Sequence, residues 1–80
     1  MLDPRFLVYT REGCALCDEF ILGLAQALER TREAFSVRDV DADAATARRF
    51  GLKVPVLTCD GSVVCHGRLD VAAVARLIAR

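Results

Sequence analysis

The sequence predicts an α/β domain in which a mixed four-stranded sheet is flanked by helices, in the element order βαβαββα. Short runs of β-forming residues alternate with segments of helical period, which indicates strands connected by helices. The dipeptide Asp60-Gly61 separates two apolar runs and is typical of a tight β-hairpin. The chain has 80 residues, of which 54% are hydrophobic. That length and composition favour one domain, residues 1–80, around one modest core.

The first half of the chain predicts a strand, a helix and a second strand. Residues 5–10 are apolar and rich in β-formers, and they end in the loop-like sequence at 11–13. A helix is expected over residues 15–31, and a second strand over 35–40. Two strands joined by a helix should lie parallel, with a right-handed crossover. The helix carries apolar residues four apart, namely Leu16, Phe20, Leu24 and Leu28.

The second half predicts a short helix, a hairpin and a last helix. A helix over residues 44–50 begins after Asp41 or Asp43, either of which can cap it. Residues 54–59 and 62–66 form the two antiparallel strands of the hairpin. The last helix carries an apolar stripe of four residues, Val71, Val74, Leu77 and Ile78.

Charge and composition exclude several classes of function. Eleven Lys and Arg residues balance eleven Asp and Glu residues, so the formal net charge is zero. A protein that binds the phosphates of nucleic acid normally has a basic excess, so we expect no nucleic-acid partner. The N-terminus lacks the basic start and apolar run of a signal peptide, and no apolar stretch approaches the roughly 20 residues of a membrane helix. We therefore expect a monomeric cytoplasmic protein without a membrane partner.

Four cysteines suggest redox or metal chemistry, and two of them form a C-x-x-C pair at Cys14 and Cys17. Cys14 follows a strand and Gly13, at the start of the longest predicted helix. The free backbone N–H groups and the dipole at a helix start stabilise an anion, so the pKa of Cys14 should fall below that of a free thiol. Cys17 lies one turn further on, where its sulfur can reach that of Cys14.

This arrangement predicts thiol–disulfide exchange. Cys14 is the expected nucleophile, which attacks a substrate disulfide, and Cys17 is the expected resolving thiol. Arg11 and Lys53 should favour the thiolate, whereas the acids Asp18 and Glu19 in the first helical turn should oppose it. The alternative is that both cysteines are small buried hydrophobes without chemistry.

The other cysteines and the single histidine predict less. With a two-residue turn, Cys59 faces Ser62 and Cys65 faces Val56, so we do not expect a disulfide between the two cysteines. A four-cysteine zinc site needs two closely spaced ligand pairs, and the sequence has one. We expect no metal, although a shared iron–sulfur cluster on a dimer stays open as an alternative. His66 is expected to be a structural or exposed residue.

Three segments together resemble the glutaredoxin branch of the thioredoxin superfamily, and in particular small bacterial glutaredoxin-like proteins. They are residues 8–17 with the two cysteines, residues 51–55 ending in Val-Pro, and residues 67–70 after the hairpin. The resemblance implies a thioredoxin-like fold. It also implies that Pro55 follows a cis peptide bond beside the cysteines and that the Val54 backbone pairs with an extended thiol peptide such as glutathione.

The resemblance further implies a substrate site around the cysteines. Arg11, Lys53 and Asp70 are the expected partners of glutathione's charged groups, and Gly67 matches one member of the family's glycine pair. His66 replaces the other glycine, and Ala15-Leu16 replaces the common Pro-Tyr between the cysteines.

These observations predict a disulfide oxidoreductase of the glutaredoxin or thioredoxin type. It would reduce protein disulfides or glutathione mixed disulfides, without a tightly bound cofactor and with glutathione as a possible co-substrate. Two alternatives stay open. One is a non-catalytic binding module that uses the face around Pro55, and the other is a metal or iron–sulfur carrier.

Overall fold

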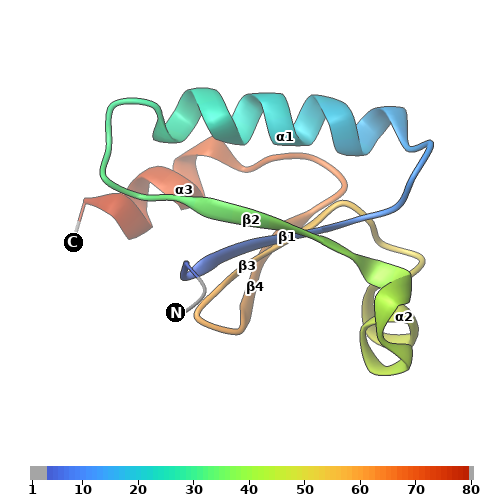
Figure 1. The fold of residues 1–80 in the computed structure, drawn as a ribbon. Coiled ribbons are helices and arrows are strands. Elements are labelled where there is room, and N and C mark those ends of the chain that lie inside the picture. Colours follow the sequence, from blue (N-terminus) through green and yellow to red (C-terminus); the bar gives the residue numbers. More distant parts are fainter. Residues whose placement is uncertain (1–3, 80) are drawn as a thin grey trace.

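The structure, a computed structural model, describes residues 4–79 and contains a mixed four-stranded sheet with helices on both faces (Figure 1). The strands lie in the order β2-β1-β3-β4. β1 is parallel to β2 and antiparallel to β3, which is antiparallel to β4. The four strands are β1 (Phe6–Thr10), β2 (Phe35–Asp39), β3 (Val56–Cys59) and β4 (Ser62–His66). The predicted element order and mixed sheet are confirmed.

The helices are divided between the two faces of the sheet. Figure 1 shows α1 and α3 together on one face and α2 on the other, near the end of β2. A short 3-10 turn, η1, follows β2 directly. The helical elements are α1 (Ala15–Leu28), η1 (Val40–Ala42), α2 (Ala44–Phe50) and α3 (Val71–Ile78). None of the helices within residues 4–79 has the length and apolar character that crossing a membrane would require.

Helix α1 ends at Leu28, three residues before the predicted end. The Thr31 hydroxyl donates a hydrogen bond of 2.7 Å to the Leu28 carbonyl, and the Thr31 backbone N–H donates to the same carbonyl at 2.9 Å. The Glu33 N–H then donates to the Thr31 hydroxyl oxygen at 3.0 Å. These local bonds satisfy groups at the end of the helix and turn the chain towards β2.

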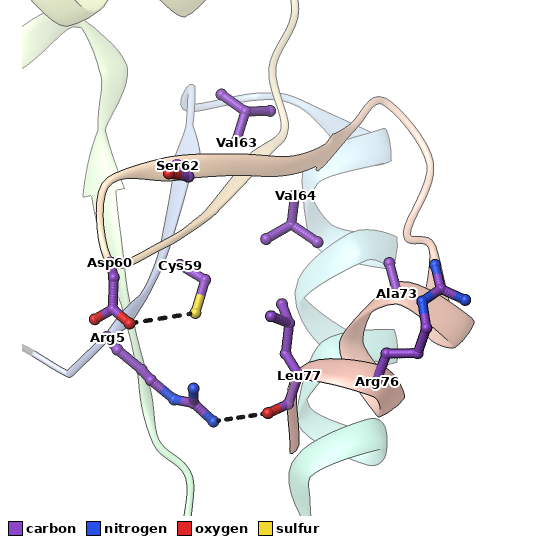
Figure 2. Close-up of a pocket in the computed structure, with 9 residues that line it drawn as sticks. All are labelled: Arg5, Cys59, Asp60, Ser62, Val63, Val64, Ala73, Arg76 and Leu77. Carbon is purple, nitrogen blue, oxygen red and sulfur yellow. Dashed lines mark hydrogen bonds between the residues drawn. The ribbon is translucent and has the colours of Figure 1, made fainter. Parts of the chain in front are cut away.

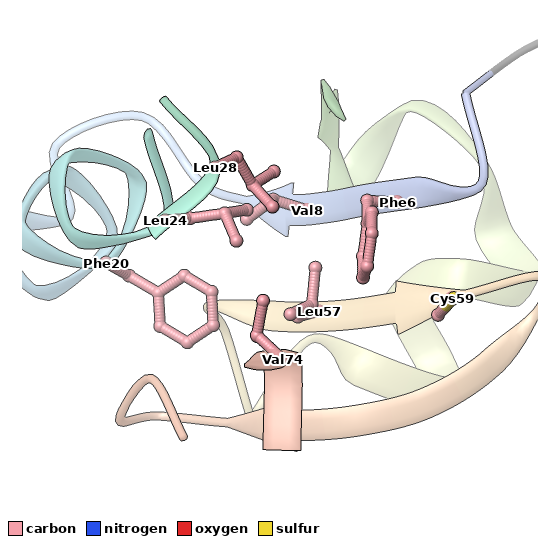
Figure 3. Packing of buried hydrophobic residues seen from close by; sticks show 8 residues of the cluster. All are labelled: Phe6, Val8, Phe20, Leu24, Leu28, Leu57, Cys59 and Val74. Atoms are coloured by element: carbon pink, nitrogen blue, oxygen red, sulfur yellow. The ribbon is translucent and has the colours of Figure 1, made fainter. Parts of the chain in front are cut away.

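The main core lies between the sheet and the pair α1 and α3 (Figure 3). Its eight buried residues come from both helices and the two central strands: Phe6, Val8, Phe20, Leu24, Leu28, Leu57, Cys59 and Val74. Leu16, predicted to lie in the same stripe, is 46% exposed instead. Cys17 takes the buried position at this end of α1, because the stripe rotates slowly around a helix of 3.6 residues per turn.

A smaller cluster fills the other face of the sheet and fixes α2. Val40, Phe50 and Val56 are buried there, with Tyr9 and Val54 packed against them. The rings of Tyr9 and Phe50 lie 5.0 Å apart between centroids. This cluster holds α2 and the chain that follows it close to the end of β1.

The hairpin turn is as predicted, but its register is not. Asp60 and Gly61 both have positive φ, 51° and 85°, as a type I′ turn requires. Cys59 faces Ser62 as expected, whereas Cys65 faces Leu57 rather than Val56. A register shift between Leu57 and Thr58 moves the pairing by one residue, as a β-bulge does.

Candidate active site

Cys14 and Cys17 form a disulfide at the start of α1, with 5.1 Å between their Cα atoms. Cys14 is the N-cap of the helix, and its sulfur accepts a hydrogen bond of 3.0 Å from the Cys17 backbone N–H. Gly13 precedes it with φ 77°, a left-handed conformation that favours glycine. The predicted position of Cys14, between a loop and the first turn of the longest helix, is therefore observed.

The two sulfurs of this pair differ in exposure. Cys14 is half-buried, whereas Cys17 is 1% exposed and packs under the first turn of α1. A substrate disulfide approaching from solvent therefore meets Cys14 first. The arrangement can support two-electron redox chemistry, because a disulfide and its two thiols interconvert by the transfer of two electrons.

The segment before β3 contains the cis peptide bond that the resemblance implied. The Val54–Pro55 peptide bond is cis, and Pro55 is buried. The Pro55 carbonyl accepts a hydrogen bond of 2.8 Å from the Gly67 N–H, which joins this segment to the loop after β4. Val54 packs into the smaller cluster beside Tyr9.

Arg11 has partners that the sequence did not suggest. Its guanidinium donates to both carboxylate oxygens of Asp41, at 2.8 and 2.9 Å, and to the Gly51 carbonyl at 2.8 Å. The hydrogen bond between the two side chains is the main reason why the pKa of Arg11 is raised and that of Asp41 lowered. Arg11 thus ties the loop before Cys14 to η1 and to the end of α2.

Asp41 is the site residue that sequence reasoning missed, since it was considered only as a helix cap. Asp43 caps α2 instead, accepting a hydrogen bond from the Ala45 N–H. A signal for the pairing was present in the strand pattern. β1 and β2 are parallel and in register, with Thr10 opposite Asp39, so the residues that follow the two strands emerge side by side.

The other residues predicted to bind substrate already form hydrogen bonds within the fold. The Asp70 carboxylate caps α3 by accepting a hydrogen bond of 3.0 Å from the Ala73 N–H. The Gly67 N–H already donates to Pro55. Lys53 is exposed in the turn between α2 and β3, and its backbone N–H donates to the Phe50 carbonyl at 2.8 Å. Lys53 therefore lies at the surface, directly before Val54 and Pro55 in the chain.

A small pocket of about 110 Å³ lies between the first turns of α1 and the loop after β4. Leu69 packs closely against α1 there, because a Cβ atom added at Gly23 would lie 3.1 Å from the Cδ2 atom of Leu69. The pocket is mostly apolar, with one acid and one base at its edge. Its lining residues are Leu16, Glu19, Phe20, Gly67, Arg68 and Leu69.

The two remaining cysteines are free thiols outside this site. Cys59 is 7% exposed at the floor of a larger pocket of about 470 Å³ between the hairpin and α3 (Figure 2). Burial raises the pKa of the Cys59 thiol. Arg5 closes one side of that pocket and donates to Glu33 and to the Leu77 carbonyl. Cys65 accepts a hydrogen bond from the Asp70 N–H at 3.5 Å.

A mixed sheet that carries a C-x-x-C disulfide at the start of its first helix defines a protein of the thioredoxin-like fold with the capacity for redox chemistry. A model of the glutaredoxin-like domain family (DUF836) matches residues 5–79. The chain belongs to this family, which confirms the resemblance found in the sequence. Within residues 4–79, no three His, Cys, Asp or Glu side chains are grouped closely enough to hold a metal ion.

Solved structures support the same fold. The protein Ne2328 of Nitrosomonas europaea is 28% identical, with a TM-score of 0.81 over 98% of this chain and 95% of its own. The target protein XcR50 of X. campestris is 34% identical, with a TM-score of 0.73 over 94% of this chain and 97% of its own. Oxidised glutaredoxin 2 of Chlamydomonas reinhardtii is 19% identical, with a TM-score of 0.56 over 90% and 70%, and shows the fold alone. Among proteins with curated descriptions, none matches the chain.

Proposed function

We propose that this protein is a thiol–disulfide oxidoreductase that reduces disulfides with the Cys14–Cys17 dithiol. The observation that carries the proposal is the unequal exposure of a disulfide at a helix N-terminus. Cys14 is half-buried with its sulfur at the N-cap, and Cys17 is 1% exposed. The backbone N–H of Cys17 points at the Cys14 sulfur, which favours a thiolate there.

In the proposed reaction, the Cys14 thiolate attacks one sulfur of a substrate disulfide. A bond forms between Cys14 and that sulfur, and the other substrate sulfur leaves as a thiolate that takes up a proton. Cys17 then loses its proton and attacks the Cys14 sulfur, which releases the second substrate thiolate. The protein gains the Cys14–Cys17 disulfide, and two electrons pass to the substrate, which ends as two thiols. A low-molecular-weight dithiol or a dithiol reductase returns the protein to its reduced form.

We propose protein disulfides, rather than glutathione mixed disulfides, as the main substrates. Three groups expected to hold glutathione already have partners in the fold: Arg11 with Asp41, Asp70 with the α3 N-terminus, and the Gly67 N–H with Pro55. The exposed side chain of Leu16 and the small apolar pocket beside it offer contacts to a folded or extended polypeptide. We place this reaction in the cytoplasm, where dithiols are kept reduced.

The test is the dithiothreitol-driven reduction of insulin disulfides by the wild type and three single variants. Cys14→Ser should abolish the catalysed rate. Cys17→Ser lacks the resolving thiol, so once it is reduced and freed of dithiothreitol it should trap a mixed disulfide between Cys14 and the substrate, visible by mass spectrometry. Cys65→Ser is the matched control, since it removes a thiol outside the site and should keep the wild-type rate. A wild type no faster than dithiothreitol alone would reject the proposal and favour a binding module.

A further inference from the structure

The positive charge nearest to Cys14 in the sequence is Arg11, which forms an ion pair with Asp41 in the folded chain. The positions of Arg11 and Cys14 are three apart in the sequence, which limits the distance between their Cα atoms to about 11 Å. The Arg11 guanidinium is held by both carboxylate oxygens of Asp41 in a two-bond, fork-like geometry, with a third bond to the Gly51 carbonyl. The side chains of Arg11 and Asp41 remain 42% and 50% exposed, so the pair is accessible to charged molecules from solvent.

The loop and first helical turn around Cys14 are otherwise acidic. Glu12, Asp18 and Glu19 are all exposed there. With Arg11 neutralised by Asp41, this part of the chain presents negative charge to an incoming molecule. Lys53 is the exposed cation beside the Val54–Pro55 segment.

We propose that Asp41 is a specificity-determining residue, which pairs with Arg11 and so biases the site against anionic disulfides in favour of neutral and cationic ones. The inference rests on the proposed function and narrows its substrate class. Asp41 acts through Arg11 and through the local field. It does not act through contact with the reacting sulfurs.

The geometry allows the charge effect to be separated from a structural effect. In Asp41→Asn the amide oxygen still accepts one hydrogen bond from Arg11, and the bond from Arg11 to the Gly51 carbonyl does not involve Asp41 at all. The variant therefore frees the positive charge while the loop stays anchored. For a ligand of charge −2 about 10 Å from the freed charge, Coulomb's law in water predicts a roughly fourfold change in the rate constant of the reaction with the ligand.

The experiment follows the oxidation of the reduced protein by three small disulfides of different charge. Glutathione disulfide is anionic, bis(2-hydroxyethyl) disulfide is neutral and cystamine is cationic. Each rate constant is divided by that of the neutral compound, which cancels changes in the reactivity of Cys14 itself. In Asp41→Asn at low ionic strength, the glutathione ratio should rise about fourfold and the cystamine ratio fall by a similar factor. Both changes should fade in 0.5 M salt, because the Debye length shrinks to a few Å.

Two further variants complete the design. Arg11→Met leaves the Asp41 charge alone and should move both ratios in the opposite direction, so it tests the proposal even if Asp41→Asn does not fold. The double variant restores a neutral pair and should return both ratios to the wild-type values. Glu33→Gln is the matched control, since Glu33 is also an acid paired with an arginine, Arg5, but at the other end of β1.

Equal changes with all three disulfides, or a double variant that keeps the Asp41→Asn ratios, would overturn the inference. Its failure is distinguishable from failure of the proposed function. The ratios come from a single oxidation of the reduced protein, which needs a reactive thiol but no turnover. The proposed function, in contrast, requires the wild type to catalyse insulin reduction.

Discussion

The sulfur of Cys14 has a structural role as a helix cap besides its proposed chemical role, and the two can be separated by substitution. Cys14 has the extended backbone of an N-cap, with φ −100° and ψ 102°, and its sulfur accepts the Cys17 N–H at 3.0 Å. Cys14→Ser and Cys14→Ala both remove the nucleophile and the disulfide. Only serine keeps a side-chain acceptor for the Cys17 N–H, and serine is among the best N-cap residues.

The expected difference in stability follows from that one hydrogen bond. Replacing an N-cap acceptor by alanine costs about 1 kcal/mol, within a range of about 0.5–2 kcal/mol. For a chain of 80 residues, the entropy of unfolding is about 0.17 kcal/mol per kelvin, so Cys14→Ala should melt about 6 °C below Cys14→Ser. Helix propensity does not contribute, because the N-cap residue is not itself helical.

The assay is urea and thermal unfolding of both variants, followed by far-ultraviolet circular dichroism with dithiothreitol present. The reduced wild type is measured under the same conditions, so that no disulfide contributes to the comparison. Insulin reduction should be absent in both variants. Equal unfolding free energies for Cys14→Ser and Cys14→Ala would refute the capping role of the sulfur.

Three further predictions concern the core, the pH dependence of stability and the remaining thiols. Leu24→Ala should cost about 3 kcal/mol in urea unfolding because Leu24 is fully buried, whereas Leu22→Ala, on the exposed side of the same helix, should cost under about 0.5 kcal/mol. The hydrogen bond from Arg5 holds the pKa of Glu33 below its usual range, so this pair stabilises the fold above the pKa of the unfolded carboxyl and loses that effect as pH falls through the lower folded value. Glu33→Gln should therefore lose less stability than the wild type between about pH 6 and pH 3, and an equal loss would contradict the pairing. Cys59 is buried and its thiol pKa is raised, so iodoacetamide should alkylate it in the native reduced protein much more slowly than in urea, as peptide mass spectrometry would show.

The fold could be predicted from the sequence because its signals are local. The apolar period distinguishes strands from helices within windows of a few residues, and Asp60-Gly61 supplies the two left-handed conformations of the hairpin turn. The boundaries were less predictable. The end of α1 depends on the Thr31 hydroxyl turning back to the Leu28 carbonyl, a choice that competes with one more helical turn.

The cysteine pair of the site could also be predicted from the sequence, whereas the ion pair between Arg11 and Asp41 could not. A cysteine pair three apart at the start of a helix is a local pattern, and the structure closes it into a disulfide. The bond from Arg11 to Asp41 joins residues thirty apart, and that from the Gly67 N–H to Pro55 joins two separate loops. Such contacts exist only once the strands are aligned.

The sequence by itself determined the order of the elements, the redox pair and the position of Cys14 at a helix start, because each follows from neighbouring residues. The tertiary structure decided that Cys17 rather than Leu16 enters the core, where the hairpin register shifts and which acid neutralises Arg11. The rotation of α1 on the sheet buries Cys17 and exposes Leu16, and the parallel register of β1 and β2 brings Asp41 to Arg11. These outcomes depend on packing between distant segments, which no local pattern encodes.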